Sequence, residues 1–127
     1  MVKLWDLNTG KAVNSLILHD YKTVSSSQWN PDSSSQNASA ILLTGGYDSK
    51  VCVSDIRISN ESTMSKKWSV NGSEEVENVK WSNDNLLYAG TDNGSLYCFD
   101  PRVEGKALWT LQAHDSGISS LEVNPFI

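Results

Sequence analysis

The sequence predicts an all-β fold built from a repeated unit of short strands, and three stretches support this prediction. The run at 44–55, TGGYDSKVCVSD, combines a glycine pair, a polar tip and alternating apolar residues, which is typical of strand, tight turn and strand. The same pattern returns at 88–100, where Asn93-Gly94 is a strong hairpin signal because both residue types tolerate positive φ. The chain also begins with a strand that closes in Trp5-Asp6.

The repeat has a measurable period. Strands that close in aspartate recur about 45 to 50 residues apart, at Asp6, Asp55 and Asp100. Aspartates at the tight turns, Asp48 and Asp92, recur at a similar distance. One spacing of apolar residues followed by a turn is shared by the segments 24–31, 76–83 and 118–125. A period of this length predicts an array of small β-sheets.

These motifs resemble the WD-repeat family of β-propellers, in which each blade is a four-stranded sheet of about 40–45 residues. The resemblance covers essentially the whole chain. Trp5-Asp6 keeps the signature pair of the family, whereas the later closings read Ser54-Asp55 and Phe99-Asp100. The resemblance therefore implies an all-β, WD-repeat β-propeller fold.

The same resemblance implies two complete four-stranded blades at about 23–70 and 76–112, flanked by partial blades at 2–17 and 118–123. Propellers close with about four to eight blades. We therefore expect residues 1–127 to be an internal piece of a longer propeller. Its exposed blade faces and an unpaired strand at 118–123 favour self-association.

Loop residues carry a closer resemblance. The runs VKLWDLN, ILLTGGYDS, DIRIS and WTLQAHD at 2–8, 41–49, 55–59 and 109–115 are similar to fungal nucleolar WD-repeat proteins of large ribosomal subunit biogenesis. This implies a non-catalytic scaffold in the nucleus and nucleolus that binds ribosome assembly factors, acts in rRNA processing and associates with rRNA indirectly. The alternative is a chromatin-associated, transcription-associated or adaptor propeller that binds a peptide at its top face.

Composition narrows the classes of partner. The net charge of −5 and the pI near 4.8 argue against nucleic acid as the primary ligand, because phosphate binding needs clustered Lys and Arg. The sequence contains no apolar run of the roughly 18 residues that a membrane-spanning helix needs, and no secretory signal pattern. Two cysteines without such a signal indicate free thiols in a reducing compartment.

The WD-repeat resemblance also implies a buried hydrogen-bond network made of His19, Thr44 and Asp48. The family places a Trp on the next strand, where this chain has Ser54, so the fourth link is open. In the following blade the resemblance assigns the turn position to Asp92 alone. The predicted role of the network is structural, with Asp48 capping its turn and orienting His19.

No combination of residues predicts an enzyme, a metal site or a cofactor. His114-Asp115-Ser116 contains the residue types of a hydrolase triad, but a triad is defined by geometry and not by sequence neighbourhood. Cys52 and Cys98, taken with the two histidines, match no zinc-ligand spacing. Gly45-Gly46 lacks the helix that a phosphate-binding loop needs.

Binding residues are expected in the top-face loops. Tyr21, Lys22 and Tyr47 are the candidate protein-binding residues, because aromatic side chains dominate interface hot spots. Each tyrosine has an equal structural alternative, as a rim residue that packs on the neighbouring blade.

Overall fold

A computed structural model describes residues 1–31, 41–56, 65–82, 84–103 and 105–124. These residues contain strands and no helix, so none of them forms a helix that could cross a membrane. The strands are β1 (Val2–Asp6), β2 (Lys11–Leu16), β3 (Val24–Trp29), β4 (Ile41–Gly46), β5 (Lys50–Asp55), β6 (Ser65–Ser69), β7 (Val76–Trp81), β8 (Leu87–Thr91), β9 (Ser95–Phe99) and β10 (Trp109–Gln112).

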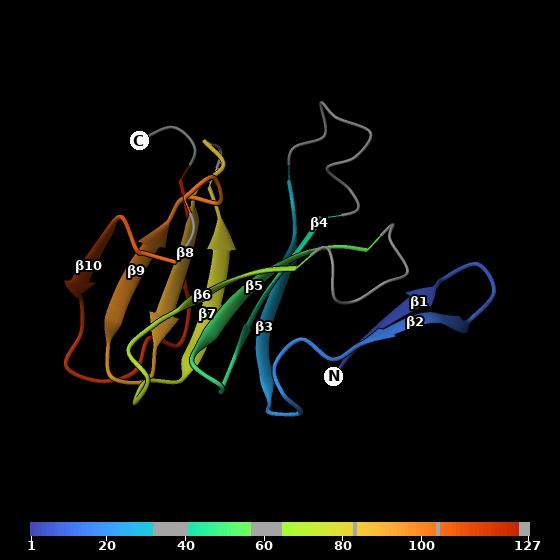
Figure 1. Cartoon of the computed structure of the whole chain (residues 1–127), viewed down its shortest axis with the longest axis horizontal. Helices are drawn as coiled ribbons and strands as arrows, with labels where there is room; N and C mark the ends of the chain where they lie inside the picture. Colours follow the sequence, from blue (N-terminus) through green and yellow to red (C-terminus); the bar gives the residue numbers. More distant parts are fainter. Residues whose placement is uncertain (32–40, 57–64, 83, 104, 125–127) are drawn as a thin grey trace.

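Consecutive strands pair antiparallel into three sheets. The order β3-β4-β5-β6 forms one four-stranded sheet, and β7-β8-β9-β10 forms the next. The strands β1 and β2 form a two-stranded sheet. Figure 1 shows the two larger sheets packed side by side, with the β1–β2 hairpin extending from the first. The predicted all-β class with antiparallel four-stranded sheets is confirmed.

The sequence predicts blades at 23–70 and 76–112. The two four-stranded sheets of the structure span Val24–Ser69 and Val76–Gln112. The sequence also predicts a partial blade at 2–17, and in the structure these residues contain the two-stranded sheet of β1 and β2. Residues 118–124, in contrast to the strand predicted at 118–123, form no strand. A strand needs a hydrogen-bonded partner, and no strand in the described part of the chain pairs with this segment.

The two tight turns between the second and third strands of each sheet depend on one left-handed residue each. Ser49 has a φ of 66° and Gly94 has a φ of 91°. The Asn93-Gly94 hairpin signal predicts a positive φ at both residues, but Asn93 does not have one. A Cβ on Gly94 would lie 2.1 Å from the carbonyl oxygen of His114. Glycine is therefore required there by both conformation and close approach.

The main core lies between the two four-stranded sheets. Inward-facing residues of β4, β5 and β6 meet those of β7, β8 and β9, and β7 packs across β3 and β4. The cluster comprises Leu43, Val51, Trp68, Val70, Val76, Val79, Trp81, Leu87, Ala89, Tyr97 and Phe99. Phe99 lies against Trp68 at 6.2 Å between ring centroids and stacks on Tyr97 at 6.0 Å. Burying each large side chain stabilises the fold by about 1.5–3 kcal/mol.

A smaller cluster joins the β1–β2 hairpin to the opposite face of the first large sheet. Leu4, Leu16 and Leu18 pack around Cys52, and all four are buried. Because side chains alternate along a strand, the residue after Leu4 points to the other face of the hairpin. That residue is Trp5, whose side chain is 56% exposed.

Candidate protein-interaction surface

One edge of the sheets gathers the loops that the sequence assigns to the top face. This loop edge consists of residues 17–23, 47–49, 70–75, 92–94 and 113–117, which lie at the lower border of Figure 1. Backbone hydrogen bonds connect successive loops, as from Tyr47 N to Thr23 O at 2.9 Å and from Asp92 N to Glu75 O at 3.0 Å. The edge is therefore a continuous surface rather than a set of independent turns.

A buried histidine organises the first part of the loop edge. His19 is 0% exposed, with Nδ1 at 2.8 Å from Asp48 Oδ1 and Nε2 at 2.8 Å from Thr44 Oγ1. Asp48 Oδ1 also accepts a hydrogen bond from Lys50 N at 3.2 Å. The structure thus brings together the three residues that the sequence places in one network.

Burial lowers the pKa of His19, and the Asp48 carboxylate opposes that shift. The neutral ring is therefore favoured, and the carboxylate assigns its proton to Nδ1, so that Nε2 accepts from the Thr44 hydroxyl. The set of acid, histidine and hydroxyl has the composition of a nucleophile relay. His19 and Thr44 are both 0% exposed, so neither side chain is in contact with solvent.

The second large sheet holds its loops with a different group, which sequence reasoning did not find. Glu74 is 5% exposed, and its Oε1 accepts from Asn93 Nδ2 at 2.6 Å and from Ser95 Oγ at 3.3 Å. Its Oε2 accepts from the Tyr97 hydroxyl at 2.8 Å. Burial raises the pKa of Tyr97, and the hydrogen bond to Glu74 adds to the rise, so the phenol stays a donor.

The structure corrects the assignment of the turn position in this sheet. Counting back from the closing aspartates by the same number of residues leads to Asp48 in one sheet and to Asn93, not Asp92, in the other. Asn93 Oδ1 accepts from Ser95 N at 3.1 Å, as Asp48 accepts from Lys50 N. Asp92 is exposed and instead accepts from Glu75 N at 2.9 Å, which ties the two neighbouring loops together.

The candidate binding residues differ in how exposed they are. Tyr21 is 75% exposed and sits in a turn with a φ of 62°, closed by a hydrogen bond from Lys22 N to His19 O at 2.8 Å. Tyr47 is half-buried, and its hydroxyl donates to Glu77 Oε2 at 3.2 Å. The charge of Glu77 raises the pKa of Tyr47. Tyr21 therefore projects from the edge, whereas Tyr47 bridges to β7.

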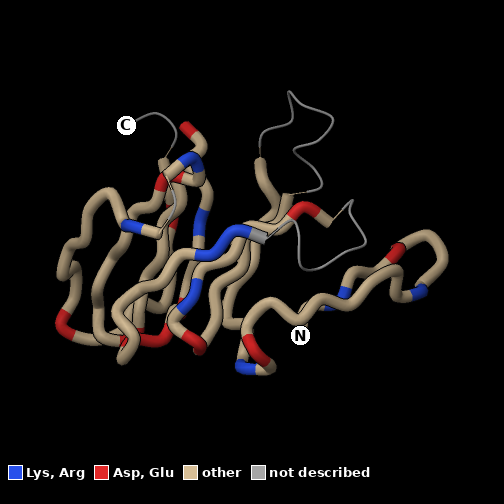
Figure 2. Tube along the Cα trace, viewed as in Figure 1, with Lys and Arg blue, Asp and Glu red and all other residues tan. Residues whose placement is uncertain are grey.

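Negative charge dominates the loop edge. Figure 2 shows acidic segments along this border of the sheets. In the loops as defined above, a single lysine, Lys22, stands among six acidic residues. The side chains of Asp48 and Glu74 are buried, so the surface charge comes from Asp20, Glu75, Asp92 and Asp115. A partner that binds at this edge is expected to present basic groups.

The other chemical candidates do not form sites. His114, Asp115 and Ser116 are exposed, and no hydrogen bond between their side chains is found. Cys52 and Cys98 are buried and form no disulfide with each other, and Cys52 Sγ lies 3.3 Å from Ser54 Oγ. Burial raises the pKa of Cys98. Among the described residues, no three His, Cys, Asp or Glu side chains converge in a way that could hold a metal ion.

Comparison with known proteins follows the same lines as the geometry. No family model matches the chain. Periodic tryptophan protein 1 of Saccharomyces cerevisiae is 52% identical over 99% of this chain, and the chain covers 22% of that protein. The Periodic tryptophan protein 1 homolog of Drosophila melanogaster is 32% identical over 97% of the chain, which covers 26% of it. The chain thus spans about a quarter or less of either relative.

Further similarities extend to WD-repeat proteins and to solved structures. An uncharacterised WD repeat-containing protein of Schizosaccharomyces pombe is 49% identical over 42% of this chain, which covers 11% of that protein. The crystal structure of Chaetomium thermophilum Raptor superposes on 91% of this chain and 10% of its own, with a TM-score of 0.74 and 20% identity. A chain of the Mitotic Checkpoint Complex superposes on 91% of this chain and 33% of its own, with a TM-score of 0.71 and 19% identity.

Proposed function

We propose, from the premise that this chain belongs to the WD-repeat β-propeller family, that it is part of a protein-interaction scaffold of large ribosomal subunit assembly. One observation carries the proposal: identity of 52% to Periodic tryptophan protein 1 extends over 99% of the chain, loops included. Identity at this level over nearly the whole length of the chain supports a shared role for the corresponding part of the two proteins. Nucleus and nucleolus are the corresponding compartments, and rRNA processing is the corresponding process.

The proposed role is non-catalytic, and the loop edge is the proposed docking surface. Its one histidine that has an acid and a hydroxyl beside it, His19, is sealed from solvent. What the edge offers to a partner is an exposed aromatic, Tyr21, on a turn that the buried histidine holds in place. Acidic loops around it suit a basic protein segment, and association with rRNA would then be indirect.

A second candidate rests on the same charge. An acidic edge with a projecting tyrosine also suits the basic peptides that chromatin-associated or adaptor propellers bind. The two functions differ in the molecules that are expected to co-purify with the full-length protein. Purification of a tagged full-length protein from its own cells distinguishes them: precursors of the large ribosomal subunit support assembly, whereas chromatin components or adaptor substrates without those precursors support the alternative.

The docking surface itself is tested by substitution in the full-length protein. Tyr21→Ala, and more strongly Tyr21→Ala with Tyr47→Ala, should reduce recovery of the precursors several-fold, while Tyr21→Phe should retain it. Val13→Ala is the matched control, because Val13 is 65% exposed but lies on β2, away from the loop edge. Wild-type recovery with the double variant, in a protein with an unchanged melting temperature, would remove the loop edge as the docking surface.

A further inference from the structure

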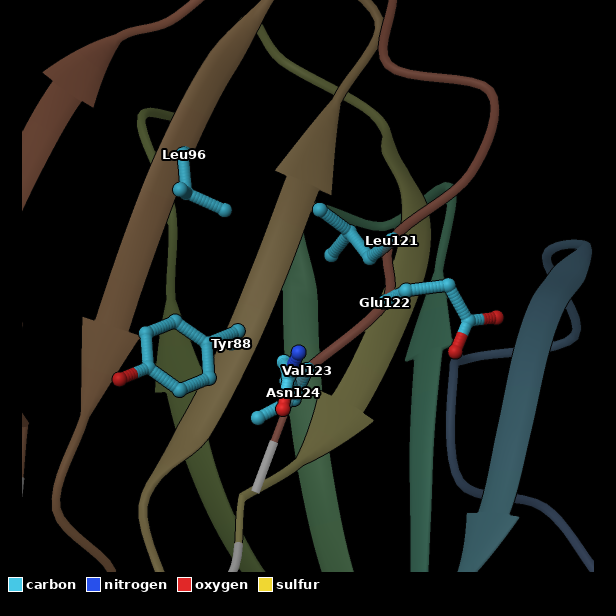
Figure 3. A pocket seen from close by; sticks show the side chains of 6 residues that line it. All are labelled: Tyr88, Leu96, Leu121, Glu122, Val123 and Asn124. Atoms are coloured by element: carbon cyan, nitrogen blue, oxygen red, sulfur yellow. The ribbon is translucent and has the colours of Figure 1, made fainter. Parts of the chain in front are cut away.

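The loop that joins β6 to β7, residues 70–75, lies between two sheets that both belong to this chain. On one side Ser49 Oγ donates to Gly72 O at 3.3 Å, and on the other Glu75 N donates to Asp92 Oδ1 at 2.9 Å. The hollow of about 390 Å³ on the outer face of the second large sheet differs, because it borders the last described residues (Figure 3). The surroundings of the 70–75 loop are therefore set by the described chain itself.

Two Asn-Gly pairs occur in the sequence, Asn71-Gly72 in this loop and Asn93-Gly94 in the β8–β9 turn. Asn-Gly is the dipeptide most prone to deamidation, because glycine has no side chain to hinder its own amide nitrogen. That nitrogen attacks the asparagine side chain and forms a cyclic imide. The attack needs a glycine nitrogen that is free and a carboxamide that can turn toward it. The two pairs differ in both respects.

The glycine nitrogens are held differently. Gly94 is buried, and its nitrogen donates to Thr91 O at 3.2 Å. Gly72 is exposed, and no hydrogen bond is found from its nitrogen to any of the described residues. A Cβ built on Gly72 would meet nothing within 4 Å, whereas one on Gly94 would lie 2.1 Å from His114 O. The nitrogen of Gly72 is therefore open to reaction, and that of Gly94 is enclosed.

The asparagine carboxamides are also held differently. Asn93 Nδ2 donates to Glu74 Oε1 at 2.6 Å, and Asn93 Oδ1 accepts from Thr91 Oγ1 at 2.9 Å. Within the described part of the chain, Asn71 Oδ1 accepts two bonds of 3.4 Å each, from the N and the Oγ of Ser73. Bonds of that length are weak. The Asn71 carboxamide is therefore free to turn toward the next nitrogen, whereas that of Asn93 must first break strong bonds.

We propose that Asn71 is a site of spontaneous deamidation and that the fold protects Asn93. A bond forms between Gly72 N and Asn71 Cγ while the bond from Cγ to Nδ2 breaks. Nδ2 leaves as ammonia, with the proton that Gly72 N loses. Water then opens the imide at either carbonyl: opening at Cγ gives aspartate, and opening at the main-chain carbonyl gives isoaspartate. In isoaspartate the main chain runs through Cγ.

The product alters the loop that carries Glu74. Asn71 O accepts from Glu74 N at 2.9 Å, and Asn71 N donates to the Tyr97 hydroxyl at 3.3 Å. In isoaspartate the main chain is longer by the Cβ atom, and the former main-chain carbonyl is part of a carboxylate beside the chain. The reaction also adds negative charge to the loop edge. We therefore expect the isoaspartyl form to melt at a lower temperature than the unmodified protein.

The test is peptide mapping by mass spectrometry of the full-length protein during incubation in mildly alkaline buffer, which favours the deprotonated glycine nitrogen. In the folded protein Asn93 should convert at least about tenfold more slowly than Asn71, because it reacts only when its turn opens. In concentrated urea the two rates should become similar, because neither pair is then held by the fold. Equal rates in the folded protein, or an Asn71 that converts in urea but not in the folded protein, would overturn the proposal.

A substitution at the glycine tests the mechanism without disturbing the fold. Gly72→Ala should slow the conversion of Asn71 by about tenfold, because the new side chain hinders the attacking nitrogen. Its melting temperature should equal that of wild type, since the added Cβ meets nothing within 4 Å. Conversion at the wild-type rate in Gly72→Ala would overturn the proposed route through the imide. An isoaspartyl fraction that melts with the unmodified protein would overturn the expected effect on the Glu74 loop.

Discussion

The two large sheets have the same strand order and register, yet they hold their loops with different chemistry. In the first sheet a neutral, fully buried histidine bridges a turn aspartate and a strand threonine. In the second sheet a buried glutamate from the β6–β7 loop collects three side-chain donors. The positions equivalent to Asp48 and Thr44 are Asn93 and Ala89.

The comparison teaches that two sheets of the same strand order and register can hold their loop edges with different polar residues. An asparagine at the turn supplies a donor, and that donor needs an acceptor, which Glu74 provides. An aspartate at the turn supplies only acceptors, so it needs the donor that His19 provides. The first centre leaves Asp48 Oδ2 buried without a hydrogen-bond partner among the described residues, whereas Asn93 in the second centre lies at an exposed position.

The largest effect is expected at Glu74. Glu74→Ala leaves the Tyr97 hydroxyl and Asn93 Nδ2 without their acceptor, whereas Ser95 Oγ keeps Gln112 Oε1 at 3.0 Å, and should lower the free energy of unfolding by about 3 kcal/mol. Urea denaturation measures the change. Glu75→Ala, next in sequence but half-buried, is the control and should cost less than about 0.5 kcal/mol. Equal midpoints for the two variants would show that the second sheet does not depend on a buried carboxylate.

A smaller effect is expected at Asp48. Asp48→Ala removes the acceptor of His19 Nδ1 and of Lys50 N, and should cost about 2 kcal/mol in the same urea experiment. Asp115→Ala, on an exposed loop of the same edge, should change the stability by less than about 0.5 kcal/mol. A loss at Asp48 no greater than at Asp115 would contradict the role of the histidine network in the first sheet.

The smallest effect concerns pH, and it distinguishes the two centres by their titratable groups. The pKa of His19 is lowered in the folded chain, so the unfolded chain binds a proton first as the pH falls through the ordinary value of 6.5. The stabilisation from His19 is therefore complete above that pH and is lost below it. His19→Gln should flatten this part of the stability curve. An unaltered slope in His19→Gln, measured by urea melts from pH 8 to pH 5, would assign the dependence to other groups.

Local signals made much of the fold predictable. Turn residues act over two positions, as when Asp48 and Asn93 each cap the amide two residues later, and alternation along a strand is set by backbone geometry alone. The segment 118–124 shows the limit of this reasoning. Its apolar spacing matches that of β7, but a strand also needs a partner, and the described residues supply none.

Some residues of the loop edge could likewise be predicted from the sequence, and others could not. His19, Thr44 and Asp48 were predictable because they match the pattern of the WD repeats that the chain resembles. Glu74 belongs to no such pattern, and an acidic residue in a polar loop is normally exposed. The sequence-based assignment of the second turn position to Asp92 instead of Asn93 has a local cause. Asp and Asn both suit a turn, and only the number of residues between the turn and Asp100 distinguishes the two positions.

By itself, the sequence determined the repeat, the acidic balance and most of the strands, because each follows from neighbouring residues or from a recurring spacing. The family resemblance implied the position of the first buried network. Only the tertiary structure decided which polar side chains are buried and which aromatics are free. Glu74 meets donors that lie 19 to 23 residues further along the chain. Tyr21 projects whereas Tyr47 reaches β7, and Trp5 stays exposed whereas Phe99 is enclosed. Burial depends on what the neighbouring sheet places against a residue, and that is set by packing between segments far apart in sequence.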